Sequence, residues 1–431
     1  MTEIAAAPFP PSSSRTLAWR KQDTLWMLGL YGTAIGAGTL FLPINAGIGG
    51  VWPLIILTLL AFPMTFFSHR AFCRFVLSGS AVEGDITEAA EEHFGKMAGN
   101  VITILYFFAI YPFLLMYSVA ITNTVESFIV HQLGMMAPPR VILSLVLVLS
   151  LMAVVRCGGQ MIVKAMSVLV FPFVFALLWL SIYLIPSWNM SVIEHTGSLD
   201  SVLSGDFVRT LWLAIPVMVF SFNHSPIISS FAVANRQYYG EKTDAKCCRI
   251  MLASHIMMMV TVMFFVFSCV FSLSPLDLAS AKEQNISILS YLANKFDNPF
   301  IAAAAPFIAF LAISKSFLGH YLGAQEGLNG LIVKALRERG KSIELSKLNR
   351  FTAIFVIITS WFVATINPSI LGMIEVLGGP IIALLLFLMP MYAMRRVPAM
   401  RQFAGKPSNV FVTVTGLIAI SAIFYVLLFG G

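Results

Sequence analysis

Eleven long apolar runs constrain this chain more than any other feature of its sequence. A helix needs about 20 apolar residues to cross the hydrocarbon core of a bilayer. The chain is 58% hydrophobic and 11% charged, whereas soluble globular domains contain about 25% charged residues. The sequence therefore predicts an all-α polytopic membrane protein with eleven transmembrane helices, at residues 25–48, 51–77, 98–130, 140–156, 161–186, 209–235, 248–273, 298–330, 350–367, 370–394 and 409–429.

The basic residues indicate the orientation of these spans. If the N-terminus lies inside, 22 of the 27 Lys and Arg residues fall in inner segments, four in outer segments and one within a span. Positive charge concentrates in cytoplasmic loops, so we expect a cytoplasmic N-terminus and a C-terminus outside. Residues 1–24 are expected to form a disordered cytoplasmic tail. The same distribution explains the net charge of +7 without a nucleic-acid partner.

The segments between the spans are too short to hold a soluble catalytic domain. The longest are an acidic inner loop at 78–97 and two outer loops at 187–208 and 274–297. The last has an amphipathic pattern that predicts a short helix over the outer face, either a lid or an ordinary interfacial helix. The chain has no phosphate-binding Walker motif and no metal or catalytic signature, so we expect neither an enzyme nor a cofactor.

The first span contains three glycines within seven residues, at positions 32, 36 and 38. Each glycine weakens a helix by roughly 1 kcal/mol relative to alanine. In a membrane, unpaired backbone groups survive only where they line a cavity or are buried in protein. We interpret the stretch as an unwound hinge in which a new helix begins near Gly36 to Thr39. The alternative is a simple kink, because glycine is common in membrane helices.

The sixth span contains a second interruption. Pro226 cannot donate its backbone amide and clashes with the carbonyl of Phe222. Ser221, Asn223, His224 and Ser225 surround this break with polar side chains, which are costly at this depth unless they face protein or water. The sequence predicts that one helix ends near Phe220 to Phe222 and another begins after it.

The two interruptions occupy matching places in two groups of five spans. A five-span unit that is repeated must be inverted, so we expect one repeat at 25–186, an inverted repeat at 209–394 and an eleventh helix at 409–431. Broken helices at matching places in inverted repeats indicate the central site of a secondary transporter. Two unrelated kinks remain the alternative.

The dipoles of the broken helices suggest the ligand. The free amides of Gly36, Ala37, Gly38 and Thr39 form a helix N-terminus, which attracts a carboxylate. Unpaired carbonyls at Phe220 to Phe222 suit an ammonium group, and the side chains of Ser221 and Asn223 can bind a polar group. The predicted ligand is an amino acid, and the predicted binding residues are Gly36, Ala37, Gly38, Thr39, Phe220, Ser221, Phe222 and Asn223.

Lys315 lies well inside the eighth span. A lysine at a helix centre costs roughly 3 kcal/mol on insertion scales, so it is expected to pair, lose its proton or face water. We interpret it as the proton-coupling group or as a fixed cation in place of sodium, with a structural ion pair as the alternative. His224, beside the second break, is the weaker candidate for proton coupling.

Three stretches of the chain resemble the bacterial serine/threonine permeases of the hydroxy/aromatic amino acid permease family. They are WRKQDTLWMLGLYGTAIGAGTLFLPINAG in span 1, LWLAIPVMVFSFNHSPIISSFAVA in span 6 and ISKSFLGHYLGAQEGLNG in span 8. The likeness extends from about Ala18 to the C-terminus and is stronger to the serine branch than to the threonine/serine branch.

The resemblance implies eleven spans, a bacterial inner-membrane location and proton-coupled amino-acid uptake, with a five-plus-five inverted repeat similar to that of the leucine transporter. It narrows the expected substrate to L-serine, with L-threonine as an alternative, and the expected partners to protons and membrane lipid. The resemblance also implies membership of the amino acid/polyamine superfamily, and Lys315 departs from the sodium-site pattern of that superfamily and favours protons. Sodium coupling, antiport and a channel remain open alternatives.

Overall fold

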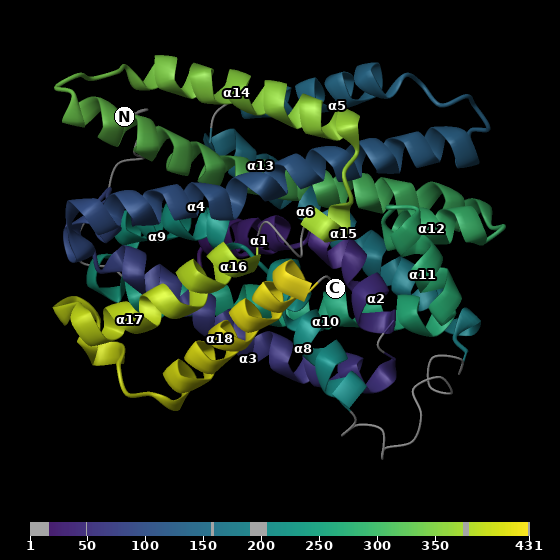
Figure 1. Ribbon diagram of the computed structural model, residues 1–431, viewed down its shortest axis with the longest axis horizontal. Helices are drawn as coiled ribbons and strands as arrows, with labels where there is room; N and C mark the ends of the chain where they lie inside the picture. The colour runs from purple at the N-terminus through teal and green to yellow at the C-terminus, as the bar shows by residue number, and fades with distance from the viewer. Residues whose placement is uncertain (1–16, 49, 157–158, 190–204, 374–378, 430–431) are drawn as a thin grey trace.

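The helices of the structure follow the apolar runs of the sequence. The computed structural model describes residues 17–48, 50–156, 159–189, 205–373 and 379–429, and that part of the chain contains helices and no strand (Figure 1). Its α-helices are α1 (Lys21–Ala34), α2 (Ala37–Ile48), α3 (Val51–Leu77), α4 (Ile86–Ser127), α5 (Arg140–Val155), α6 (Gly159–Tyr183), α8 (Gly205–Ser221), α9 (Ser225–Tyr239), α10 (Thr243–Ser272), α11 (Pro275–Glu283), α12 (Ile288–Lys295), α13 (Pro299–Glu338), α14 (Leu345–Ile366), α15 (Ile370–Met373), α16 (Gly379–Ile382), α17 (Met389–Arg396) and α18 (Pro407–Phe429).

The all-α membrane fold class is confirmed, including the two broken helices. Within the described ranges, seven helices are long and apolar enough to cross a membrane, or eight when the bent pair α1–α2 counts as one span. Two shorter apolar helices, Arg140–Val155 and Phe207–Ser221, add to these. The number eleven and the inverted repeat stay predictions.

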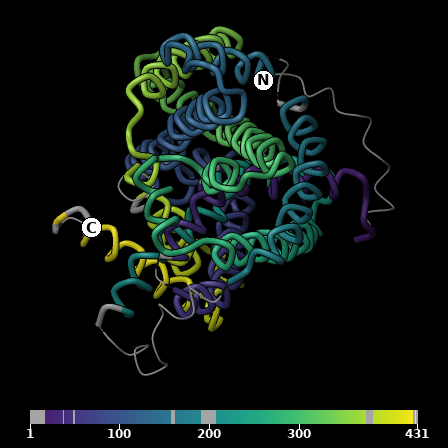
Figure 2. The backbone as a smooth tube through the Cα atoms, turned by 90° about the vertical axis from the view of Figure 1, so that its right-hand side faces the viewer, coloured from purple at the N-terminus to yellow at the C-terminus, as the bar shows by residue number. Residues whose placement is uncertain are grey.

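α13 is the central packing element of the bundle. It packs along α4 and also contacts α6, α1, α9 and α12. Its glycines permit a close approach, because a Cβ added to Gly327 would lie 3.1 Å from the backbone Cα of Phe107 in α4. A Cβ added to Gly319 would lie 2.4 Å from Oγ1 of Thr33 in α1. Small residues serve the same purpose in other membrane helix pairs. Figure 2 shows the bundle after a turn of 90°, with several helices seen end-on.

The acidic segment expected as a loop at 78–97 is largely helical, so that prediction is wrong for residues 86–94. α4 begins at Ile86 because the side chain of Asp85 accepts hydrogen bonds from the amides of Thr87 and Glu88, which satisfies two otherwise unpaired donors. Gly95 then bends the helix with a φ of 83°. The segment has too few apolar residues to span a bilayer, which is why a length criterion missed it.

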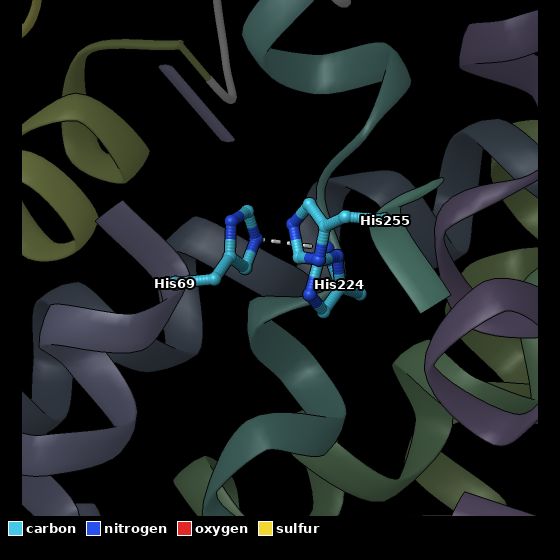
Figure 3. A group of neighbouring side chains, drawn as sticks. All are labelled: His69, His224 and His255. Atoms are coloured by element: carbon cyan, nitrogen blue, oxygen red, sulfur yellow. Dashed lines mark hydrogen bonds between the residues drawn. The ribbon is translucent and has the colours of Figure 1, made fainter. Parts of the chain in front are cut away.

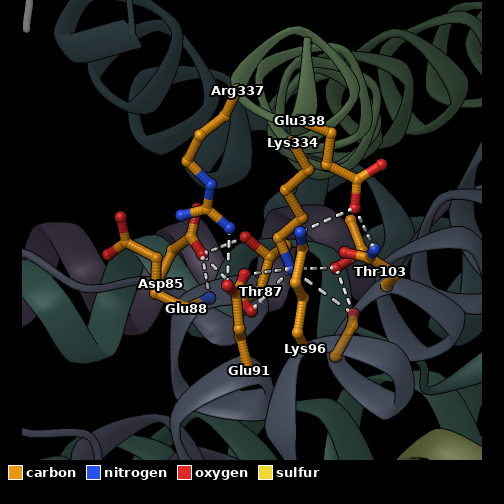
Figure 4. A network of polar contacts seen from close by, with 11 residues as sticks. Asp85, Thr87, Glu88, Glu91, Lys96, Thr103, Lys334, Arg337 and Glu338 are labelled. Carbon is orange, nitrogen blue, oxygen red and sulfur yellow. Dashed lines mark hydrogen bonds and ion pairs between the residues drawn. The ribbon is translucent and has the colours of Figure 1, made fainter. Parts of the chain in front are cut away.

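A polar network attaches this bent start of α4 to the end of α13 (Figure 4). The Nζ atom of Lys334 donates to the carbonyl of Thr87 at 3.1 Å and to Oγ1 of Thr103 at 2.9 Å. Glu91 pairs with Lys334 at 3.3 Å and with Arg337 at 2.5 Å. Glu91 of this segment therefore neutralises basic residues of α13.

The outer segment 274–297 contains two helices, α11 and α12, where the sequence predicts one. They pack against α2, and α12 also packs against α13. Asp277 connects them, because its carboxylate accepts hydrogen bonds from Ser274 and Tyr291 and forms an ion pair with Lys295. These contacts place the pair over the helix that follows the first break.

Asp277 gives this segment a pH-dependent stability. Burial alone would raise the pKa of its carboxyl group, but the hydrogen bonds from Lys295 and Ser274 outweigh burial and lower the pKa from 3.8 to about 2. The ionised carboxylate therefore stabilises the fold above pH 3.8, and this contribution is lost as the pH falls toward 2.

We expect Asp277→Asn to lower the free energy of unfolding at neutral pH by about 1 kcal/mol, because the lysine partner is partly exposed to solvent. The difference in the free energy of unfolding between the variant and the unmodified protein should narrow as the pH is lowered to about 2.5. Thermal unfolding in detergent at neutral pH and at this low pH measures that difference. Asp297→Asn, at an exposed carboxylate of the same segment, is the control. An effect of equal size at both pH values would contradict the argument.

Candidate functional site

The two helix breaks meet in the interior of the bundle. α1 ends at Ala34, Ile35 is extended, and α2 begins at Ala37 with its axis bent by 51° from that of α1. The second break separates α8 from α9. Oγ1 of Thr39 donates to the carbonyl of Ser221 at 3.0 Å. Oγ of Ser221 lies 3.0 Å from the carbonyl of Gly38 and 2.8 Å from that of Val217, so its one proton is shared between these two acceptors. The predicted halves of the site are therefore hydrogen-bonded to each other.

The glycines of the first break permit this approach. A Cβ added to Gly38 would lie 2.6 Å from the ring of Phe220 and 3.1 Å from the backbone Cα of Ser221. A Cβ added to Gly36 would lie 2.2 Å from Oγ of Ser316 in α13. Real Cβ atoms do not come so close to their neighbours, so only glycine fits at either position without a shift. The amides of α2 from Ala37 to Thr39 precede the first helical hydrogen bond, in which the amide of Leu40 donates to the carbonyl of Gly36 at 3.2 Å.

The carbonyls at the second break are not unpaired, contrary to the expectation from the sequence. The carbonyl of Phe220 accepts a bond from the amide of Asn223 at 3.0 Å. That of Ser221 accepts from Thr39, and that of Phe222 lies 3.0 Å from Nδ1 of His224. Each carbonyl oxygen has two lone pairs, so each retains the capacity to accept one further bond from an ammonium group.

Two residues beside the breaks were not predicted as parts of the site. Oγ of Ser316 lies 3.3 and 3.0 Å from the carbonyls of Gly32 and Thr33, so its one proton is shared between two carbonyls at the buried end of α1. The ring of Phe113 in α4 stacks on Phe220 with centroids 4.4 Å apart. Ser316 adjoins Lys315 in a polar stretch of an apolar span, which was a usable signal, whereas Phe113 has no local signal in the sequence.

Asn223 and Lys315 carry buried polar atoms without partners. The side-chain oxygen of Asn223 accepts from the amide of Ser225 at 3.1 Å, but its Nδ2 atom has no hydrogen-bond partner among the described residues. Lys315 is fully buried, and its Nζ atom likewise has none within that part of the chain. That atom lies 3.4 Å from the ring centroid of Phe173 in α6 and 5.7 Å from that of Tyr31 in α1.

His224 lies in separate surroundings, in a cluster of three histidines (Figure 3). Its ring stacks on that of His69 in α3 with centroids 3.8 Å apart, and the ring of His255 in α10 lies 4.7 Å away. All three side chains are fully buried. Within the described residues, these three histidines are the one group of three or more His, Cys, Asp or Glu side chains that could hold a metal ion. The sequence predicts neither a metal nor this cluster.

A buried ion pair lies at the N-terminal end of α1, away from the break. Asp23 and Lys246 in α10 are fully buried, with a nitrogen–oxygen distance of 2.6 Å. Tyr239 donates to Asp23 at 2.5 Å, and Lys246 donates to the carbonyl of Ala18 at 2.7 Å. α1 begins at Lys21, inside the segment that the sequence assigns to the tail, so this contact was not foreseen.

Asp23→Ala is expected to lower the free energy of unfolding by roughly 3–5 kcal/mol, because it leaves a buried lysine unpaired. Replacing both partners, as Asp23→Leu with Lys246→Met, should recover most of that loss, because apolar pairs of similar volume substitute well for buried ion pairs. Chemical or thermal unfolding in detergent compares the variants. A single variant as stable as the unmodified protein would show that the pair contributes nothing.

An all-helical membrane bundle with two broken helices that meet in its interior is the arrangement typical of secondary transporters. A solved structure of a manganese transporter mutant from Eremococcus coleocola has a similar fold, with a TM-score of 0.61 and 14% identity, over 93% of this chain and 85% of that one.

Sequence comparisons identify the family. The tryptophan/tyrosine permease family matches residues 26–428. The chain is 69% identical to the serine transporter SdaC of Escherichia coli over 410 residues, which is 95% of each chain. It is 50% identical to the threonine/serine transporter TdcC of Yersinia enterocolitica, over 96% of this chain and 97% of that one. The chain belongs to the tryptophan/tyrosine permease family and is a multi-pass membrane transporter, not an enzyme.

Proposed function

We propose that this protein takes up L-serine together with protons across the bacterial inner membrane by alternating access, with its N-terminus in the cytoplasm. The observation that carries the proposal is the pair of hydrogen bonds between Thr39, Ser221 and Gly38, which joins the two helix breaks. The similarity to serine and threonine/serine transporters supports the substrate class, and the distribution of Lys and Arg supports the orientation.

The substrate carboxylate binds the amides at the start of α2, from Gly36 to Thr39, where the helix dipole favours negative charge. The ammonium group binds the second lone pairs of the carbonyls from Phe220 to Phe222. The hydroxyl oxygen of Ser221 and the unpartnered side-chain Nδ2 atom of Asn223 are then available for the hydroxyl group of serine. Because Thr39 and Ser221 are bonded to each other in this structure, the substrate has to replace contacts between the two breaks.

The coupling proton binds Lys315. This side chain has no acidic partner within 4.0 Å among the described residues, and an unpaired charge is costly in such a site. Lys315 contacts aromatic rings of α1 and α6 from α13. Protonation therefore changes the charge between the first broken helix and the helices that surround it. The coupling proposal does not use His224, the weaker candidate from the sequence.

The test of the substrate is uptake of radiolabelled L-serine into proteoliposomes, with an excess of unlabelled competitors. We expect saturable uptake that L-serine blocks most effectively, L-threonine less effectively and L-tryptophan hardly at all. Stronger competition by L-threonine than by L-serine would favour the threonine/serine alternative, which the 50% identity to TdcC supports. Uptake that does not saturate would contradict a transporter and indicate a channel.

A further inference from the structure

We propose that His69, His224 and His255 form a binding site for a divalent transition metal ion of the zinc type. Occupation of this site holds the second helix break against α3 and α10 and stops the transport cycle. Metal binding itself is independent of the proposed function, whereas the inhibition of serine uptake rests on it.

Hydrogen bonds at the Nδ1 atoms of the three rings fix the tautomer in which Nε2 can bind a metal. Nδ1 of His69 lies 2.7 Å from the carbonyl of Thr65, Nδ1 of His224 lies 3.0 Å from that of Phe222, and Nδ1 of His255 lies 2.7 Å from that of Met251. A carbonyl can only accept, so each Nδ1 carries the proton. Each Nε2 then presents a lone pair, and a backbone carbonyl fixes the tautomer and the ring, as metal-binding histidines require.

Two of the three Nε2 atoms have no hydrogen-bond donor among the described residues. Those of His224 and His255 are buried and have no hydrogen-bond partner in the described part of the chain. That of His69 accepts a bond of 3.2 Å from the backbone amide of His224. Three acceptors thus share a single donor, and buried polar atoms seldom remain unsatisfied. A metal ion satisfies all three and costs the one bond from the amide.

The spacing of the rings suits a small ion. One ring nitrogen of each histidine lies within 4.8 Å of the others. The centre of such a triangle is at most about 2.8 Å from each corner, near the Zn–N distance of about 2.0–2.1 Å. The rings of His69 and His224 are stacked with their planes 8° apart, so one of the two rings has to rotate before both lone pairs point at one ion. Three imidazoles without a carboxylate favour Zn²⁺, Ni²⁺ or Cu²⁺ over Mg²⁺ and Ca²⁺, which prefer oxygen ligands.

The three histidines come from three separate elements of the fold, which is why a bound metal ion is expected to inhibit transport. His69 lies on α3, His255 on α10 and His224 in the break that precedes α9. Alternating access requires the broken helices to move relative to their neighbours. An ion that binds only when the three elements are together shifts the population toward that conformation.

Direct binding is the first test. Zn²⁺ is titrated calorimetrically into the purified full-length protein in detergent, and Co²⁺ is used as a spectroscopic probe. We expect one ion per chain, with an affinity that falls at least 10-fold in His255→Gln and in His69→Gln. His93→Gln is the control, because His93 lies in α4 and bonds to Ser78 outside the cluster. Absent binding, or binding that survives both cluster substitutions, would overturn the site.

Transport is the second test. Zn²⁺ should inhibit L-serine uptake into proteoliposomes, and a chelator should restore it. His255→Gln should retain uptake and lose at least 10-fold in sensitivity to Zn²⁺, whereas His93→Gln should stay as sensitive as the unmodified protein. Equal sensitivity in all three proteins would overturn the inhibition. If calorimetry shows metal binding but neither the unmodified protein nor any variant transports serine, the proposed function fails and the metal site stands.

Discussion

Gly38→Ala is expected to slow serine uptake by about 10- to 100-fold while the protein still inserts into the membrane. The added Cβ would lie 2.6 Å from the ring of Phe220 and 3.1 Å from the backbone of Ser221. Such overpacking costs roughly 1–3 kcal/mol, and each 1.4 kcal/mol corresponds to about a factor of ten. The change forces apart the two breaks between which we place the substrate.

Gly29→Ala in α1 is the matched control for this experiment. Its Cβ would lie 3.7 Å from a methyl group of Ile227, which is an ordinary contact. The same substitution in the same span should therefore leave uptake near that of the unmodified protein. Initial rates in proteoliposomes, normalised to the amount of inserted protein, measure both variants. Normal uptake by Gly38→Ala would contradict a site between the two breaks.

Lys315→Ala is expected to abolish serine accumulation driven by a proton gradient while serine exchange persists. Exchange needs the substrate site alone, whereas accumulation needs a group that binds and releases the driving proton. Lys315→Arg should behave in the same way, because an arginine keeps its proton in proteins. Counterflow of labelled serine measures exchange, and uptake under an imposed gradient measures accumulation.

Lys164→Ala is the control for the lysine variants. Lys164 is exposed on α6, the helix that also carries Phe173, so its loss should affect neither measurement. Accumulation that continues unchanged in Lys315→Ala would remove Lys315 from the coupling mechanism. Loss of both exchange and accumulation would instead indicate that Lys315 supports the substrate site or the fold.

The sequence predicts the parts of the fold that depend on local chemistry. The two breaks follow from glycine and proline, and α2 begins at Ala37 and α9 at Ser225, as the pattern indicates. The start of α4 was also readable, because Asp85 is a typical N-cap residue. The length of apolar runs does not indicate this helix, because its first turns contain too few apolar residues to span a bilayer.

The rest of the site depends on contacts between distant parts of the chain. His69 and His255 lie in apolar helices without a spacing that relates them to His224, so the cluster forms only through packing of α3 and α10 against the break. Asp23 and Lys246 are likewise far apart in sequence. The carbonyls at the second break, expected to be unpaired, have partners because the first break, with Thr39, packs against them.

The most direct test of the account is serine accumulation in proteoliposomes under a proton gradient or a sodium gradient, imposed separately. We predict that a proton gradient directed inward, without sodium, raises internal serine above the external concentration, and that a protonophore abolishes the effect. Accumulation driven by sodium alone, or simple equilibration of serine under either gradient, would contradict proton-coupled transport.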